Sequence, residues 1–425
     1  MKTTDANGTY IQVAVAAPVA ELFDYLPPYP AGDIAILPGM RVLVPFGRGR
    51  RIGMVTAIST TTSLAVDRLK RIETLLDPYP LLSAEDLRFV LWAASYYRSS
   101  PAEALFSALP ARLRRPEALL HNAPPGWRVA AVPAAYEQRQ HIQQRAPRQA
   151  AILALLDAHP KGMNDAALRQ HLGNCGAALR ALAEKGLIER CHIDNHSTNT
   201  AAESSADKSY PSIQSLELNP DQQAAVCAVR ETTGFGCFLL DGVTGSGKTE
   251  VYLRLIGDAL RLGQQVLVLV PEIGLTPQLY DRFAQRIDVP MAVLHSSLSK
   301  RERELAWQQA SSGRARLALG TRSAVFTPLP DLGLIIVDEE HDLSLKQQEG
   351  FRYSARDLAV RRAQVTACPV LLGSATPSLE SLHNARLGRY RPLRLPQRAG
   401  AAIAPRILIA DIRSQPLETG CAMHC

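Results

Sequence analysis

Residues 242–249, Gly-Val-Thr-Gly-Ser-Gly-Lys-Thr, have the types and spacing of a phosphate-binding loop. Glycine lets backbone N–H groups approach a triphosphate closely, and Lys248 would place a positive charge against its β- and γ-phosphates. The hydroxyl of Thr249 would take one position around Mg²⁺. We therefore predict that ATP and Mg²⁺ bind to all eight residues: Gly242, Val243, Thr244, Gly245, Ser246, Gly247, Lys248 and Thr249.

Such a loop needs a strand before it and a helix after it. The apolar residues 238–240 predict a short buried strand that runs into Asp241. After the loop, apolar residues recur at helical spacing: Val251, Leu253, Leu255, Ile256 and Leu260. A strand, a glycine-rich turn and the start of a helix would direct backbone N–H groups at one point.

ATP hydrolysis also needs a carboxylate near the metal and a group that orients water. The apolar residues 334–337 predict a buried strand, and Asp338-Glu339-Glu340-His341 follows it directly. Ligands collect at the carboxyl ends of strands in open α/β sheets. We expect Asp338 to hold Mg²⁺, directly or through water, and Glu339 to polarise the attacking water. Further apolar runs at 266–270, 317–319 and 370–372 predict parallel strands that are buried on both faces.

Length and charge limit the class of protein. The chain has 425 residues, which predicts roughly two to four domains. No run of about 18 apolar residues predicts a membrane span, and the N-terminus lacks a signal-peptide pattern, so we expect a cytoplasmic protein. The net charge of +7 favours a polyanionic partner. The seven cysteines are scattered, and Cys421, His424 and Cys425 are too few for a closed zinc site.

The N-terminal region predicts strands and turns. Residues 10–15 alternate as a strand does, and 41–46 and 52–58 predict a hairpin across 47–51. Arginines at that hairpin tip are placed either for phosphate contacts or as an ordinary solvated turn. Basic residues are common in this region: Arg41, Arg48, Arg50, Arg51, Arg68, Lys70 and Arg71. Residues 83–109 predict a helical region.

Residues 148–192 predict three short helices and a strand, which is the pattern of a winged helix. Such modules dock on DNA or contact protein, and the sequence does not choose between these roles. The residues before it, from 113 to 147, lack periodicity and predict a connector. Residues 194–215 are rich in Ser, Asn, Thr and Ala and predict a linker.

Further motifs follow in the order of the DExH helicases of superfamily 2. The segment 268–278 resembles motif Ia, 319–326 resembles motif Ib, and 372–378 resembles motif III. A narrower likeness lies in 346–353 and 355–359, which resemble the aromatic-rich loop of the PriA family of primosomal replication-restart helicases. The resemblance to that family extends from the N-terminal region to about Gly420.

The resemblance implies a binding site for the 3′ end of a nascent leading strand. Matching positions are Phe23, Asp24, Tyr25, Gly47 and Lys70. An aromatic face can stack a terminal base, a carboxylate can accept from a 3′-hydroxyl, and a lysine can offset a phosphate. Without the resemblance, these residues would be interpreted as ordinary core, surface or turn residues.

The resemblance also implies roles around the ATP site. Gln222 would read the adenine edge, and Arg322 would line the single-strand track with motif Ia. Phe351 and Tyr353 would stack on bases or couple DNA to the ATP site. His341, Ser374 and Thr376 would link the state of the site to movement between lobes.

The implied architecture is multidomain: a small mostly-β DNA-binding domain, a winged helix, and one α/β RecA-like helicase lobe with a parallel sheet. The expected ranges are 1–112 for the 3′-DNA-end-binding domain, 113–147 for the connector, 148–193 for the winged helix, 194–215 for the linker, 216–412 for the helicase lobe and 413–425 for a divergent tail.

The implied function is that of an ATP-dependent 3′-5′ DNA helicase of the primosome, which uses ATP and Mg²⁺. Its partners would be forked DNA, single strands, 3′ ends, single-stranded-DNA-binding protein and other primosome proteins. The family also carries a zinc module, a second lobe and an arginine of motif VI. We find none of them before Cys425. We therefore expect a truncated chain that binds ATP–Mg²⁺ weakly and DNA detectably but unwinds little. Alternatives are another superfamily 2 translocase and a non-enzymatic fork-binding module.

Overall fold

The computed structural model describes residues 8–29, 35–120, 125–130, 142, 146–159, 163–173, 175–192, 217–272, 277–399, 417–418 and 421–422. The predictions for the linker 194–215, for residues 273–276 of motif Ia and for the side chains of Cys421, His424 and Cys425 lie outside this part. In the residues that are described, no helix is long and apolar enough to cross a membrane.

The N-terminal region is a five-stranded sheet with the order β2-β1-β4-β3-β5. A parallel bridge between Leu26, directly after β2, and Arg71, shortly before β5, connects the two edges of this sheet. The hairpin of β3 and β4 differs from its prediction, because β4 begins at Gly49 and the turn is only Gly47-Arg48. The strands are β1 (Tyr10–Val15), β2 (Phe23–Tyr25), β3 (Arg41–Phe46), β4 (Gly49–Ser59) and β5 (Thr74–Leu75), with a 3-10 turn at Val66–Arg68.

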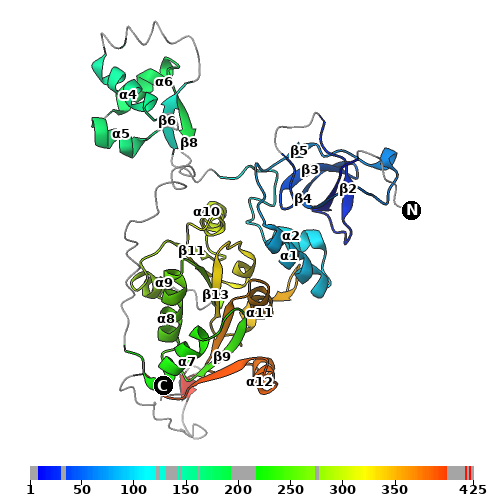
Figure 1. Ribbon diagram of the computed structural model, residues 1–425, viewed down its shortest axis with the longest axis vertical. Helices are drawn as coiled ribbons and strands as arrows, with labels where there is room; N and C mark the ends of the chain where they lie inside the picture. The colour runs from blue at the N-terminus through cyan, green and yellow to red at the C-terminus, as the bar shows by residue number, and fades with distance from the viewer. Residues whose placement is uncertain are drawn as a thin grey trace.

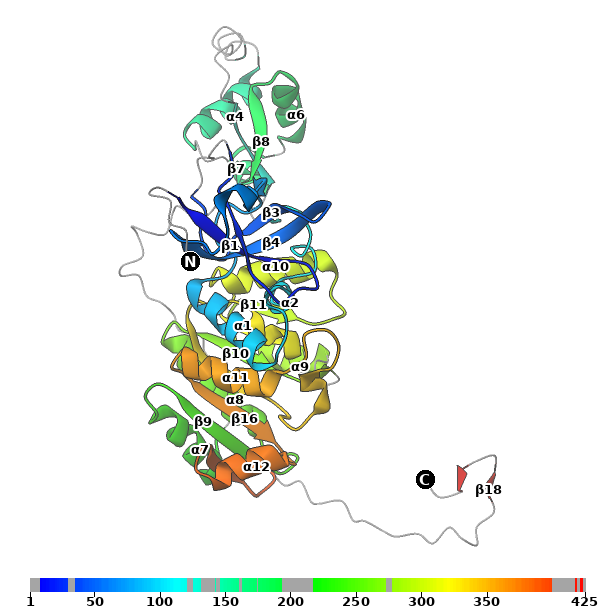
Figure 2. The ribbon, with the colours of Figure 1, turned by 90° about the vertical axis from the view of Figure 1, so that its right-hand side faces the viewer.

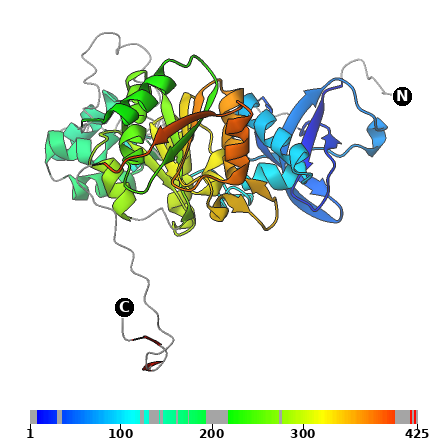
Figure 3. The same cartoon turned by 90° about the horizontal axis from the view of Figure 1, so that it is seen from below.

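Two helices follow this sheet, α1 (Ala84–Tyr96) and α2 (Pro101–Ser107). The helical prediction for 83–109 is therefore corrected to two helices. Arg98 has a left-handed φ of 54°, and Pro101 can start a helix but cannot continue one. The two helices lie between the five-stranded sheet and the lobe formed by residues 217–399 (Figure 3).

A second unit has its own core around Trp127, Leu156 and Leu182. It contains β6 (Pro125–Val129), α4 (Pro147–Asp157), β7 (Met163–Asn164), α5 (Asp165–Leu172), α6 (Gly176–Glu184) and β8 (Ile188–His192). The sheet order is β7-β6-β8, and Figure 1 shows β6 beside β8. The predicted connector 113–147 thus contains a strand, β6, whose Trp127 is buried in this core. The winged-helix assignment stays a prediction.

The third unit is a seven-stranded parallel sheet with the order β11-β12-β10-β13-β16-β9-β17. The parallel strands that the apolar runs predicted are β10, β12, β13 and β16. Its strands are β9 (Gly236–Gly242), β10 (Gln265–Leu269), β11 (Met291–Leu294), β12 (Leu317–Gly320), β13 (Leu332–Val337), β16 (Pro369–Ser374) and β17 (Arg391–Leu395). Its helices are α7 (Pro220–Arg230), α8 (Lys248–Arg261), α9 (Pro277–Ala284), α10 (Lys300–Ser311), α11 (Ala355–Val365) and α12 (Leu379–Arg386). Short elements complete the described residues: 3-10 turns Arg322–Phe326 and Leu343–Leu345, and β14 (Lys346–Gln347), β15 (Tyr353–Ser354), β18 (Leu417–Glu418) and β19 (Cys421–Ala422).

Successive side chains of the parallel strands enter two different cores, because a strand alternates its faces. Leu240 and Ile336 pack on one face with α7 and α8. Leu239 and Ile335 pack on the other face with α10, α11 and the N-terminal helices α1 and α2. Figure 2 shows α1 beside α11. The parallel-sheet lobe and the mostly-β N-terminal unit confirm these two parts of the predicted fold class.

Candidate functional site

The phosphate loop joins the end of β9 to the start of α8. Gly245 and Gly247 have left-handed φ angles of 79° and 84°, which favour glycine. A Cβ on Gly247 would lie 2.3 Å from Nε2 of Gln222, so a side chain there would displace the Gln222 amide. Within the described part of the chain, the buried hydroxyl of Ser246 has no hydrogen-bond partner. The loop thus combines a tight backbone with an unpaired donor, as a phosphate site requires.

Lys248 lies between the two halves of the site. Its Nζ donates to the carbonyl oxygen of Gly242 at 3.2 Å and lies 3.6 Å from Oε1 of Glu339. The predicted lysine and the predicted water-orienting carboxylate therefore meet, although they lie 91 positions apart along the chain. A phosphate that enters the loop would replace these contacts with stronger ones to its own oxygens.

Asp338 follows β13 and is held from α8. The hydroxyl of Tyr252 donates to Oδ1 of Asp338 at 2.9 Å. Burial raises the pKa of this carboxyl, and the hydrogen bond from Tyr252 acts in the opposite direction. A bound cation favours the charged form of a buried carboxylate, so Asp338 fits a magnesium ligand. The next residue, Glu339, has a left-handed φ of 46°, a strained conformation of the kind that clusters at functional sites.

Gln222 lies directly against the loop. Its Nε2 donates to the carbonyl oxygen of Ser246 at 2.8 Å, and its Oε1 accepts from the backbone N–H of Asn219. It is 3% exposed and closes a capping box at the start of α7. Both ends of the amide are therefore engaged with the protein, and adenine recognition by Gln222 stays a prediction.

The three residues predicted to couple the site to movement lie together. Nδ1 of His341 is 2.8 Å from the hydroxyl of Ser374, and its Nε2 is 3.4 Å from the hydroxyl of Thr376. The backbone N–H of Thr376 also donates to Ser374. His341 thus joins the segment after β13 to the segment after β16.

The sequence analysis assigned no role to Glu340, which forms the strongest link between these segments. Its carboxylate is buried and accepts from four donors: Ser378 N at 2.7 Å, Ser381 Oγ at 2.8 Å, Ser378 Oγ at 3.0 Å and Arg356 Nη1 at 3.1 Å. A partial signal was present in the sequence, since Glu340 is the third consecutive acidic residue after a buried strand, and a buried carboxylate needs partners.

Arg322, predicted to line the single-strand track, contacts two other segments of the lobe. Its Nη1 donates to the carbonyl oxygen of Ser344 at 3.2 Å, and its Nη2 lies 3.5 Å from Oε1 of Glu272. Glu272 belongs to the predicted motif Ia. The structure thus brings Arg322 and this motif together, and their contact with DNA stays a prediction.

Phe351 and Tyr353 do not present their rings for base stacking. They are 2% and 6% exposed and pack against Phe326, with ring centroids 5.8 Å and 5.0 Å away. Phe351 also meets Tyr97, the residue that directly follows α1, edge-on at 6.3 Å. Direct stacking on bases is therefore corrected: tertiary packing uses these ring faces in the hydrophobic core.

Three of the residues predicted for a DNA 3′ end lie at or near the β3–β4 turn. Phe23 meets Phe46 edge-on at 5.2 Å, and Tyr25, which is buried, donates to the carbonyl oxygen of Pro45. Gly47 has a left-handed φ of 58° and open space around it.

Two further positions complete this group. The backbone N–H of Leu26 donates to the carbonyl oxygen of Lys70, which lies beside β2. Asp24 points to the opposite face of its strand from Phe23, where Oδ2 accepts from Thr62 at 2.7 Å. The group is thus close in space but shares no single face.

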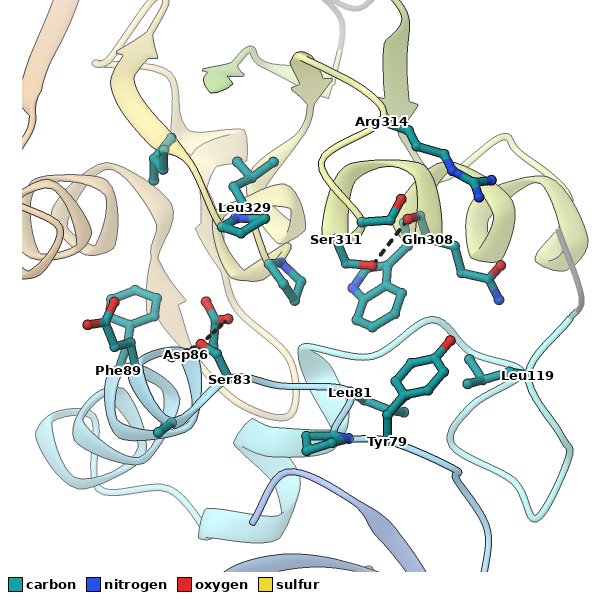
Figure 4. Close-up of a pocket in the computed structure, with 18 of the residues that line it drawn as sticks. Tyr79, Leu81, Ser83, Asp86, Phe89, Leu119, Gln308, Ser311, Arg314 and Leu329 are labelled. Atoms are coloured by element: carbon teal, nitrogen blue, oxygen red, sulfur yellow. Dashed lines mark hydrogen bonds between the residues drawn. The ribbon is translucent and has the colours of Figure 1, made fainter. Parts of the chain in front are cut away.

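A cavity of about 1420 Å³ lies elsewhere, between residues 76–89 and the parallel-sheet lobe (Figure 4). Its lining is mostly apolar and includes Tyr79, Phe89, Leu119 and Leu329. None of the described lining residues belongs to the phosphate loop or to the segment 338–341. We therefore place the candidate ATP site at the loop and not in this cavity.

Family models match two parts of the chain. The 3′ DNA-binding domain of PriA matches residues 12–110, and the DEAD/DEAH box helicase matches residues 219–385. The chain is similar to the replication restart protein PriA of Haemophilus influenzae, with 41% identity over 412 residues, 96% of this chain and 55% of the relative. For the PriA of Bacillus subtilis, the values are 33% over 457 residues, 92% and 56%.

The chain thus spans about half the length of the curated relatives that it matches. Among solved structures, it is similar to RecG bound to a three-way DNA junction, with 23% identity and a TM-score of 0.33. That match covers 44% of this chain and 24% of the solved one.

Proposed function

Because this chain belongs to the PriA family of replication restart proteins, we propose that it forms part of an ATP-dependent 3′-5′ DNA helicase that recognises arrested replication forks. The observation that carries this proposal is the meeting of Lys248 with Glu339 beside Asp338. A phosphate loop and two carboxylates at the ends of parallel strands form the arrangement that phosphoryl transfer uses.

Each residue of the site has a part in this proposal. Lys248 and the loop N–H groups would bind the β- and γ-phosphates, and Thr249 and Asp338 would hold Mg²⁺. The metal, when bound, neutralises charge that develops on the phosphate oxygens. Glu339 would orient the attacking water. Because it already lies 3.6 Å from Lys248, little movement is needed to bring it to the phosphate.

DNA recognition would divide between two parts of the chain. Residues 1–112 would bind a 3′ end around Phe23 and Gly47, and Arg322 would contact the single strand on the lobe 216–412. A winged helix over 148–193 would add a further contact. Single-stranded-DNA-binding protein and other primosome proteins are the proposed protein partners, and the cytoplasm is the proposed compartment.

The test is ATP hydrolysis by the purified 425-residue chain, with and without forked DNA, beside Lys248→Ala. We expect that the wild-type chain binds a fluorescent ATP analogue in the presence of Mg²⁺ and that Lys248→Ala does not. We also expect a preference for DNA with a free 3′-hydroxyl over DNA with a blocked 3′ end. Equal nucleotide binding by both proteins would contradict the ATP site.

The hydrolysis assay, together with a fork-DNA binding assay of the same two proteins, tests the non-enzymatic alternative. If that alternative holds, fork binding needs no nucleotide and is unchanged in Lys248→Ala, and neither protein hydrolyses ATP above background. Robust DNA-stimulated hydrolysis that is lost in Lys248→Ala would instead show that this chain is a complete ATPase.

A further inference from the structure

The β3–β4 hairpin presents exposed arginines at its tip: Arg48, Arg50 and Arg51. The turn Gly47-Arg48 connects paired strands, and the positive φ of Gly47 before a residue with negative φ fits a type II′ turn. Because both strands continue up to this turn, the arginines have fixed directions. The proposed function uses Gly47 but assigns no role to these side chains.

The strand register separates Arg50 from Arg51. Directly opposite residues of an antiparallel pair point to the same face, and Arg51 lies opposite Val44 while Arg50 lies opposite Pro45. Val44 belongs to the core cluster that contains Tyr25, and Phe46 and Phe23 pack against the same cluster. Arg51 therefore shares a face with Phe23 and Phe46, and Arg50 points away from it.

The partners of the two arginines agree with this division. Arg50 forms an ion pair with Glu73, with Nε 2.8 Å from Oε2. Within the described part of the chain, no carboxylate lies in ion-pair distance of Arg51. A free guanidinium beside an aromatic pair offers both charge and forked donors to an anion. The anion that fits beside a stacked base is the phosphodiester that follows it along the strand.

We propose that Arg51 binds a backbone phosphate of the DNA strand whose 3′ end occupies the Phe23 face, with Arg48 at the turn as a second contact. This inference rests on the DNA-end part of the proposed function and adds to it. The ligand class is a phosphodiester backbone, read without regard to base sequence. Such contacts set the position of a strand and make its binding dependent on salt.

The experiment is a fluorescence anisotropy titration of single-stranded DNA with the full 425-residue chain at several salt concentrations. Arg51→Ala should raise Kd about three- to tenfold, as expected for one charge-assisted contact at a solvated surface. It should also reduce the slope of log K against log salt by about 0.7, the value for one phosphate on a single strand. Arg50→Ala, on the opposite face of the same hairpin, removes the same charge and is the matched control. Its Kd should stay within about twofold of wild type.

Two results would overturn the inference. One is a salt slope in Arg51→Ala equal to that of wild type. The other is an equal loss in Arg50→Ala, which would show that only net charge matters. Circular dichroism of both variants is the check that they fold. The DNA-end proposal has a different readout from the Arg51 proposal. It would be contradicted if the wild-type chain bound DNA with free and with blocked 3′ ends equally well, whatever the salt slopes of the arginine variants.

Discussion

Replacement of Glu340 by alanine tests whether the segments after β13 and β16 are held as the structure shows. The Glu340 side chain is 0% exposed, and its carboxylate accepts from Arg356, from Ser381 and from both the backbone and the hydroxyl of Ser378. In Glu340→Ala, the guanidinium of Arg356 keeps Asp357, at 2.9 Å, as an ionic partner. The donors of the half-buried Ser378 and the buried Ser381 lose this acceptor.

The magnitude follows from these contacts. Removal of one partner of a buried ion pair costs about 3–5 kcal/mol, because it leaves an uncompensated charge. Asp357 is half-exposed and still accepts from Arg356, which places the expected loss near the lower end, about 3 kcal/mol. Glu340→Gln keeps the shape and one acceptor, so it should cost about 1–3 kcal/mol.

The assay is native-state hydrogen exchange of the backbone amides of β13 and β16, which reports the free energy of opening of this lobe directly. Glu339→Gln is the matched control, because it changes the same group one residue away at a partly exposed position. It should alter the opening free energy by about 0.5 kcal/mol or less. A loss below about 1 kcal/mol in Glu340→Ala would refute the claim that a buried, fully used carboxylate holds the two segments together.

Three further predictions concern the site and its attachment. Burial raises the pKa of the Asp338 carboxyl, so the native state binds a proton on this group more tightly than the unfolded chain does. The free energy of unfolding therefore falls as the pH rises through the unfolded-state pKa and then the folded-state pKa of Asp338. Asp338→Asn should therefore raise the melting temperature, measured without ATP or Mg²⁺, more at pH 7 than at pH 4, and an equal change at both pH values would contradict this cause. Gly247→Ala should lower the free energy of unfolding, measured in urea, by about 1–2 kcal/mol for its left-handed backbone and by a further amount for the steric clash with Gln222. Gly263→Ala is the control, because Gly263 has a φ of 72° and nothing within 4 Å, so only the backbone contribution should appear. Nε of Arg112 lies 2.6 Å from Oε2 of the buried Glu304. Arg112→Ala should therefore lower the opening free energy of α10, measured by hydrogen exchange, by about 2–4 kcal/mol. Exchange equal to wild type would show that this ion pair does not stabilise α10.

The sequence predicted the parts of the site that local pattern controls. Buried parallel strands need apolar residues on both faces, so β10, β12, β13 and β16 were visible as apolar runs. The loop before Lys248 has a fixed spacing because phosphate contacts demand it. These features depend on residues close together in the chain.

The features that were missed depend on distant residues. Glu340 gains its meaning from Ser378, 38 positions later, and no local pattern shows that pairing. The rings of Phe351 and Tyr353 are aromatic in the sequence whether they meet a base or Phe326; only tertiary packing decides. The strand β6 was hidden by prolines around it, and its partner β8 lies about 60 residues further along the chain.

The same dependence on tertiary packing explains how the N-terminal unit is attached to the lobe. Phe89 of α1 lies 6.0 Å from Phe326, between ring centroids, and both belong to the core cluster that covers one face of the parallel sheet. The backbone N–H of Ser354, which caps α11, donates to the hydroxyl of Tyr97 at 3.3 Å. A tethered domain would bury its own core and leave a polar interface. Here α1 and α2 complete the core of the lobe, so the family boundary near residue 110 is not a boundary in packing. A displacement of these helices would reach Ser354 and the start of α11, where Arg356 holds Glu340 beside the ATP site.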